Sequence, residues 1–446
     1  MDEIRENGSV TAQDTAGDPL AAVPLDQRQH WLTPAMIFGG LEFCVPILMI
    51  GASLAVSFGL IQIIPILLIA FVGIQWAGNA LNGYMGAKTG RSSSVLARCS
   101  FGANQARIII ALVIGIACMG WWGIQTAVTG NSICAMLNID YTLAENFGKW
   151  VGITIATGVI FAIPSVLGYT SMKWTDYIAV PAGLLMVIFG IYLGVKHGGG
   201  WAAIFAARPV VAGMTSIAAI NMILGMNVSQ FVISADYTRN AKPTIRDNIK
   251  IPLGIIAVGV PLMMVGAIMA VGQGTGDIVQ VMVNLGFPIW GFLVLWLSSW
   301  TSQLVNNYSM GLSLSTLFNA RTNKGRILLT IAGTAVSLVL SIMGIMNNFV
   351  EFLALTALCY APIAGIMFAD FFLRNREWVD HEGWNYMATL ALVLGVILGY
   401  ITSYVVPMGI PAIHGTIFTA LVYVLAMKVK ASIKPDAFTP KRFLKG

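Results

Sequence analysis

The chain has 446 residues, of which 57% are hydrophobic and only 10% are charged, and its formal net charge at pH 7 is +6. Soluble domains carry about 25% charged residues, so this composition excludes an ordinary soluble protein and predicts a polytopic all-α membrane protein. The basic residues lie in short loops and tails rather than on one folded face, so we expect the lipid bilayer, and no nucleic acid, as partner.

The N-terminal segment 1–30 is polar and acidic. It lacks a basic region followed by an apolar stretch, so we expect a disordered cytoplasmic tail and no cleaved signal peptide. The five cysteines are scattered through apolar segments without a C-x-x-C pair. We therefore predict neither a disulfide framework nor a zinc site.

Apolar stretches of the length of a membrane helix, about 20 residues, recur from residue 33 to residue 430. We predict a single transporter domain over 31–430, followed by a cytoplasmic tail at 431–446. Its twelve predicted transmembrane helices lie at 33–58, 61–86, 107–137, 149–168, 176–196, 213–235, 250–272, 285–317, 327–346, 349–373, 386–404 and 408–429.

The first predicted helix contains signals for a break. Gly39 and Gly40 weaken the helix and Pro46 removes a backbone donor, so we expect it to break near the middle of the membrane. Glu42 lies between these signals and is the only acidic residue deep within a predicted segment. A charge at the bilayer centre costs at least about 2.5 kcal/mol, so Glu42 indicates a polar cavity.

Three roles for Glu42 remain open at this point. It accepts hydrogen bonds from an N–H-rich substrate, it carries a driving proton, or it is a structural carboxyl group that is protonated or paired.

The third predicted helix contains Trp121, Trp122 and Gln125, which are candidate substrate contacts. Trp121 and Gln125 are four residues apart and therefore share a helix face. An indole ring stacks on a flat ligand and an amide both donates and accepts, so this face fits a planar heterocycle. The alternative is a packing tryptophan beside a glutamine that joins two helices.

The sixth predicted helix has Gly225 and a run of polar side chains from Asn221 to Gln230, at the same relative depth as the first break. We expect a second break here. The segment ends at Asp236 and Arg239, which form either a boundary ion pair or part of a gate.

The eighth predicted helix is unusually polar from Ser298 to Ser309. Hydroxyl oxygens, together with carbonyl groups freed from a broken helix, are the hard ligands that Na⁺ needs. Gln303 and Asn307 are candidate substrate ligands instead. Hydroxyl groups also bond to their own helix backbone, so a purely structural role is the alternative.

The distribution of basic residues predicts the topology. With both termini in the cytoplasm, all Lys and Arg residues lie on the cytoplasmic side except Lys149, Lys196 and Arg208. This asymmetry supports both the number of helices and their orientation in the cytoplasmic membrane. The chain shows no phosphate-binding loop, so we do not expect it to use ATP.

Several motifs in order resemble the nucleobase:cation symporter-1 family, which includes cytosine and hydantoin permeases. The resemblance covers most of the chain from 30 to 430. It rests on the residues at 83–90, 96–102, 121–126, 234–239 and 362–373.

The resemblance implies a LeuT-like fold with two inverted repeats of five helices, at 31–196 and 213–373, and two more helices at 386–430. It implies substrate contacts from Trp121, Gln125, Asn227 and Asn307. It also implies a sodium site formed by the carbonyl groups of Gly39, Glu42 and Ser298 and the hydroxyl groups of Thr301 and Ser302. Asn227 stands where relatives have an aromatic residue, and Glu42 where they generally have an uncharged one.

We therefore predict a monomeric cation-coupled importer of a nucleobase-like heterocycle such as cytosine, driven by Na⁺ or H⁺ through alternating access. It is not expected to be an enzyme or to use a cofactor. A transporter of another small amidine or amine, or of a hydantoin-like or creatinine-like compound, is the first alternative. An intramembrane enzyme and a receptor without transport are alternatives from other classes.

Overall fold

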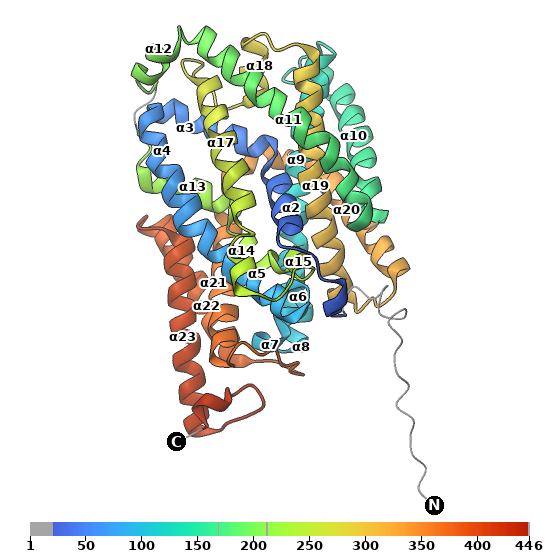
Figure 1. Cartoon of the computed structure of the whole chain (residues 1–446), viewed down its shortest axis with the longest axis vertical. Helices are drawn as coiled ribbons and strands as arrows, with labels where there is room; N and C mark the ends of the chain where they lie inside the picture. Colours follow the sequence, from blue (N-terminus) through green and yellow to red (C-terminus); the bar gives the residue numbers. More distant parts are fainter. Residues whose placement is uncertain (1–20, 168, 211–212, 445–446) are drawn as a thin grey trace, which may run out of the picture.

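The computed structural model describes residues 21–167, 169–210 and 213–444, so most of the predicted N-terminal tail lies outside the described residues. Within these ranges the regular structure is helical, apart from one isolated bridge between Gln29 and Ala241. The long helices run side by side, with α23 on one flank of the bundle and α10 on the other (Figure 1).

Each predicted segment corresponds to a helix or to a set of consecutive helices. In chain order these are α2 (Leu32–Glu42) with α3 (Val45–Ser57); α4 (Leu60–Leu68), η2 (Ile69–Gln75) and α5 (Trp76–Thr89); η3 (Ala106–Ile110) with α9 (Ala111–Met136); α10 (Phe147–Leu167); α11 (Tyr169–His197); α13 (Ser216–Asn227), α14 (Gln230–Ile233) and α15 (Ala235–Thr238); α17 (Leu253–Ala270); α19 (Ile289–Phe318); α20 (Asn323–Ile342); α21 (Phe349–Leu373); α22 (Tyr386–Tyr400) with η6 (Ile401–Val405); and α23 (Pro411–Ile433).

Shorter helices lie in the connections. They are η1 (Leu25–Gln27), α6 (Ser93–Leu96), α7 (Arg98–Phe101), α8 (Ala103–Gln105), η4 (Ala144–Asn146), α12 (Trp201–Ala206), α16 (Ile245–Asn248), α18 (Ile278–Asn284), η5 (Ile345–Asn348) and η7 (Lys441–Phe443).

Among the described residues, nine helical spans are long and apolar enough to cross a membrane, or ten when the bent pair α2 and α3 counts as one. The two other predicted spans correspond to α11 and α19, helices of 29 and 30 residues. Twelve crossings and the inverted repeat of five helices therefore stay predictions. Many large apolar side chains are exposed, which suits contact with lipid.

The predicted break in the first segment is confirmed. Helices α2 and α3 meet at an angle of 56°, with Phe43 and Cys44 between them. Pro46 lies in the first turn of α3, where its missing N–H group breaks no helical hydrogen bond. At the break, the Gly40 carbonyl group accepts a hydrogen bond from the side chain of Thr301 on α19 at 2.9 Å.

The sixth segment is irregular rather than sharply bent. The helix is interrupted at Val228 and Ser229, where the N–H groups of Phe231 and Val232 donate to carbonyl groups only three residues earlier. Side chains of the second segment satisfy freed backbone groups, because Gln75 donates to the Asn227 carbonyl at 3.1 Å and Asn82 accepts from the Ala235 N–H at 2.8 Å. Helices η2 and α5 thus support the irregular stretch.

Helices α9 and α19 form the most extensive contact between two elements of the bundle. Helix α19 also contacts α2, and α17 packs closely along α2 and α3. Close approach depends on glycine: a Cβ atom at Gly254 would lie 1.9 Å from the Ala35 carbonyl oxygen, and one at Gly266 would lie 2.1 Å from that of Leu48. This packing brings the break between α2 and α3 against the polar part of α19.

Candidate functional site

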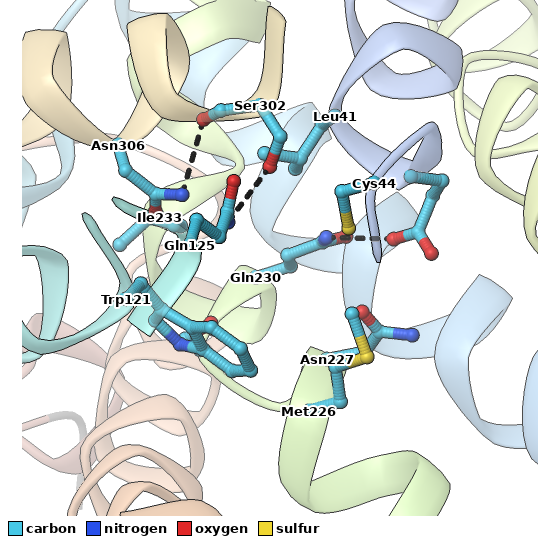
Figure 2. A pocket seen from close by; sticks show the side chains of 12 residues that line it. Leu41, Cys44, Trp121, Gln125, Met226, Asn227, Gln230, Ile233, Ser302 and Asn306 are labelled. Atoms are coloured by element: carbon cyan, nitrogen blue, oxygen red, sulfur yellow. Dashed lines mark hydrogen bonds between the residues drawn. The ribbon is translucent and has the colours of Figure 1, made fainter. Parts of the chain in front are cut away.

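A cavity lies beside the break between α2 and α3, between that break, α9, the irregular sixth segment and α19 (Figure 2). Its volume is about 30 Å³. It is lined by Leu41, Glu42, Cys44, Trp121, Gln125, Met226, Asn227, Ser229, Gln230, Ile233, Ser302 and Asn306.

Helix α9 contributes Trp121 and Gln125, which lie on the same face as their spacing predicts. The indole ring of Trp121 is held edge-on by Phe349 and Phe352, at centroid distances of 6.1 and 5.3 Å. Gln125 Nε2 donates to Ser302 Oγ at 3.1 Å, while Gln125 Oε1 is buried without a hydrogen-bond partner. The face thus offers an aromatic plane and one open acceptor.

Glu42 is the last residue of α2, and only 1% of its surface is exposed. Its Oε1 atom accepts a hydrogen bond from Gln230 Nε2 at 2.9 Å, and its Oε2 atom has no hydrogen-bond partner. Gly259 of α17 leaves room for the carboxyl group, since a Cβ atom there would lie 3.0 Å from Oε2. An unpartnered oxygen in this position is an open acceptor for a ligand.

Asn227 ends α13 and places its side chain beside the Glu42 carboxyl group. The contact lacks the geometry of a hydrogen bond, and Asn227 Nδ2 is buried without a hydrogen-bond partner. Glu42 and Asn227 therefore present an acceptor and a donor to the same cavity.

Two of the groups predicted for sodium, the Thr301 hydroxyl and the Ser298 carbonyl, lie where α19 meets the end of α2. Thr301 Oγ1 lies 2.9 Å from the carbonyl oxygens of both Gly40 and Ser298 and donates to them. The carbonyl group next to Thr301 is thus that of Gly40, rather than that of Gly39 as the resemblance implies. The Gly39 carbonyl accepts from the Phe43 N–H at 3.1 Å, and the Glu42 carbonyl accepts from the Cys44 N–H at 2.9 Å.

Ser302 belongs to both sets, because it lines the cavity and follows Thr301. No group of three or more His, Cys, Asp or Glu side chains that suits a metal ion occurs in the described part of the chain. Neutral oxygens of this kind fit an alkali cation better than a transition metal.

Three residues predicted to contact substrate do not line this cavity. Asn307 Nδ2 donates to Ser165 Oγ at 2.7 Å, and Asn307 Oδ1 accepts from Thr334 at 3.0 Å, so this side chain joins α19 to α10 and α20. Gln303 Nε2 donates to Thr126 Oγ1 at 2.9 Å. Trp122 is fully buried, and its ring faces Gly158 of α10.

The structure instead brings Ser229, Gln230 and Asn306 to the cavity. Helical spacing contained the signal for Asn306, because it lies four residues after Ser302 and so shares its face, whereas Asn307 is turned by about 100°. No comparable signal identified Gln230, since its direction depends on the irregular backbone just before it.

The cavity is much smaller than a ring-shaped ligand, as a cavity of about 150 Å³ is needed to hold benzene. In this structure the cavity is therefore too small to hold a ring-shaped ligand.

Comparison with known proteins supports the fold and identifies the family. Residues 23–416 match the family model described as permease for cytosine/purines, uracil, thiamine, allantoin. The cytosine permease of Escherichia coli K12 is 26% identical over 398 residues, which cover 86% of this chain and 89% of the relative. The allantoin permease of Bacillus subtilis is 25% identical, covering 91% and 92%.

Solved structures show the same fold. The nucleobase-cation-symport-1 family transporter Mhp1, in a closed conformation with bromovinylhydantoin bound, superposes with a TM-score of 0.78 at 20% identity, covering 95% of this chain and 98% of that one. A Na⁺-coupled sialic acid symporter in an outward-open state gives a TM-score of 0.65 at 15% identity, covering 92% and 90%. Because the family model spans most of the sequence, we conclude that this chain belongs to the family of permeases for cytosine and purines, uracil, thiamine and allantoin.

Proposed function

We propose that this permease imports a small planar heterocycle of the nucleobase type, with a cytosine-like hydrogen-bonding edge, together with Na⁺ or H⁺. The substrate binds in the cavity beside the break between α2 and α3. Transport proceeds by alternating access in the cytoplasmic membrane, and the gradient of the coupling ion drives uptake.

One observation carries this proposal: unpartnered donor and acceptor atoms surround the cavity next to an aromatic ring. Glu42 Oε2 and Gln125 Oε1 are open acceptors, and Asn227 Nδ2 is an open donor. A heterocycle with N–H groups next to a carbonyl or ring nitrogen pairs with such a set, while the face of Trp121 supports its ring. Buried polar groups without partners are costly, so a complementary ligand gains specificity by satisfying them.

The oxygens around Thr301 support coupling to Na⁺. The carbonyl groups of Gly40 and Ser298 already converge on Thr301 Oγ1, and a cation between them would replace the hydroxyl proton as their partner. With Na⁺ as the coupling ion, the membrane potential contributes about 2.3 kcal/mol per charge and 100 mV.

A second cavity of about 710 Å³ lies farther along α9 than the candidate site. Its walls include Ser53 near the end of α3 and Val128 and Asn131 on α9. Val128 follows Gln125 by three residues, so the two cavities share a face of α9. The distribution of basic residues predicts that this second cavity lies on the outer side of the membrane.

The opposite end of the α2–α3 segment is closed. Arg28 is only 8% exposed; its guanidinium group donates to the carbonyl groups of Val23, at 2.8 and 2.9 Å, of Ala87 and, at 3.4 Å, of Ala241. Gln29 forms two backbone hydrogen bonds with the segment that follows α15. These contacts join the chain before α2 to the ends of α5 and α15, and we propose that they close this end to the substrate.

Uptake into proteoliposomes tests the proposal. Labelled cytosine should accumulate when the outer buffer contains Na⁺ or when a proton gradient is imposed. Uracil, hypoxanthine, allantoin, hydantoin and creatinine should be compared as competitors. Failure of the purified protein both to bind and to accumulate every compound of this panel would overturn the proposal.

A further inference from the structure

We infer that Gln75, which does not line the cavity, is a positioning residue that fixes the direction of the Gln230 amide group and thereby holds Glu42 as a hydrogen-bond acceptor. The inference rests on the proposed function for its consequence in ligand binding. Its structural basis is a chain of hydrogen bonds from the end of η2 through α14 to the end of α2.

The chain starts at a backbone carbonyl group. Gln75 Nε2 donates to the carbonyl oxygen of Asn227 at 3.1 Å and to Gln230 Oε1 at 3.2 Å. A carbonyl oxygen only accepts hydrogen bonds, so the Gln75 amide cannot reverse without setting its own oxygen against that of Asn227. The Asn227 carbonyl group therefore fixes the orientation of the Gln75 amide group.

The orientation of the Gln75 amide group in turn fixes the orientation of the Gln230 amide group. Because Gln230 Oε1 faces the Gln75 amide nitrogen, Gln230 must turn its own nitrogen toward Glu42, where it donates to Oε1 at 2.9 Å. All three side chains are at least 95% buried, so water does not compete for these positions. We call the hydrogen bonds from Gln75 through Gln230 to Glu42 the relay. In this relay each amide donates its N–H group in the direction of the Glu42 carboxyl group.

The relay also determines which polar atoms of the cavity remain available to a ligand. The relay satisfies one oxygen of Glu42 and leaves Oε2 as an acceptor, while the same Gln75 nitrogen anchors the backbone of Asn227, whose Nδ2 is free. Glu42 Oε2 and Asn227 Nδ2 together select ligands that carry an N–H or NH₂ donor beside an acceptor. A ligand with only carbonyl oxygens at this edge would face the carboxyl group with like partial charge and be rejected.

A double-mutant cycle between Gln75 and Glu42 tests the relay. Gln75→Met removes the anchor but keeps the volume, and Glu42→Gln gives position 42 an amide that accepts either direction of Gln230. In the ligand-free protein, Gln75→Met should lower the thermal unfolding temperature in the wild type and much less in the Glu42→Gln background. Gln230→Met breaks the relay in the middle and should show the same dependence on position 42.

Gln105→Met is the matched control, because Gln105 is a fully buried glutamine on α8 that does not line the cavity. Its effect should be the same in both backgrounds. Equal effects of Gln75→Met in both backgrounds would overturn the relay.

The same variants are also tested for ligand binding, with cytosine as the probe. Gln75→Met should weaken cytosine binding about tenfold in the wild type and less than about twofold in the Glu42→Gln background. Absence of cytosine binding to the wild type would contradict the proposed function while the stability cycle still decides on the relay. Binding to the wild type with equal losses in both backgrounds would contradict the relay alone.

Discussion

Gln125 and Ser302 join the two candidate sites, because the amide nitrogen of Gln125 donates to the hydroxyl oxygen of Ser302 at 3.1 Å. Gln125 lines the cavity from α9, and Ser302 lies next to Thr301 in the oxygen cluster of α19. A change at either residue therefore reaches the other through a single hydrogen bond.

This contact predicts reciprocal coupling between substrate and sodium. Replacing choline with Na⁺ at fixed pH and ionic strength should raise the affinity for substrate, and substrate should raise the affinity for Na⁺ by the same factor. Ser302→Ala should reduce that factor. Calorimetric titrations in both orders measure it, and binding that is indifferent to Na⁺ would contradict sodium coupling.

Trp121 should provide the stacking surface. Trp121→Ala should weaken binding by about 1–3 kcal/mol through lost stacking and contact area. Gln125→Ala should cost about 1–3 kcal/mol because a polar edge of the ligand loses its partner. Trp296→Ala, at a tryptophan outside the cavity, serves as the control in the same binding titration. Unchanged affinity in both cavity variants would remove these residues from the site.

Glu42→Gln separates the roles left open for the carboxyl group. If Glu42 contacts the substrate, the variant should lose affinity at every pH from about 5.5 to 8.5, most of all for ligands with two neighbouring N–H donors. If Glu42 carries the coupling proton, the variant should still bind and exchange substrate but lose uptake driven by a proton gradient.

Sodium coupling through Glu42 would instead remove the Na⁺ dependence and keep the ranking of ligands. Equilibrium binding with and without Na⁺ distinguishes these outcomes. Identical affinities of both proteins under all conditions would exclude the substrate and sodium roles together.

The neighbours Asn306 and Asn307 form a natural pair for comparison. Asn306 lines the cavity, whereas Asn307 bonds to Ser165 and Thr334. Asn306→Ala should weaken substrate binding with little loss of thermal stability. Asn307→Ala should lower the unfolding temperature, since two buried hydrogen bonds between helices are lost at about 0.5–1.5 kcal/mol each, while Ser165 and Thr334 keep bonds to their own helix backbones. The reverse pattern would support the assignment implied by the family resemblance.

His381 gives the stability a dependence on pH. It lies in the connection between α21 and α22 and packs against Phe438 at a centroid distance of 4.9 Å. Burial, with Arg374 nearby, lowers the pKa of His381 below its ordinary value of 6.5. The native state therefore binds the proton more weakly than the unfolded chain, so this stabilisation is present above pH 6.5 and is lost as the pH falls through the lowered pKa.

The unfolding temperature should thus fall between pH 7.5 and pH 5.5 and fall less in His381→Asn. His197, whose side chain lies at the end of α11, offers His197→Asn as the control. An equal fall in wild type and His381→Asn would show that other groups are responsible.

The sequence by itself determined the helical class, the approximate positions of the long helices, the break between Gly40 and Pro46, and the family. These features depend on local composition, since the cost of burying polar groups in lipid acts on every stretch of about 20 residues. Helical spacing also put Trp121 and Gln125 on one face. The family resemblance, rather than helical spacing, predicted a substrate role for Asn307, which lies on another face of α19 than Ser302 and Asn306.

Only the tertiary structure decided which polar groups meet. The hydrogen bond between Gln230 and Glu42 joins residues 188 positions apart, and that between Thr301 and Gly40 spans 261 positions. Such contacts depend on how α5, α14 and α19 pack around the break, and the irregular backbone at Val228 and Ser229 turns Gln230 to a direction that no regular spacing describes. The side chains that complete the site are therefore fixed by packing between distant helices rather than by any local pattern.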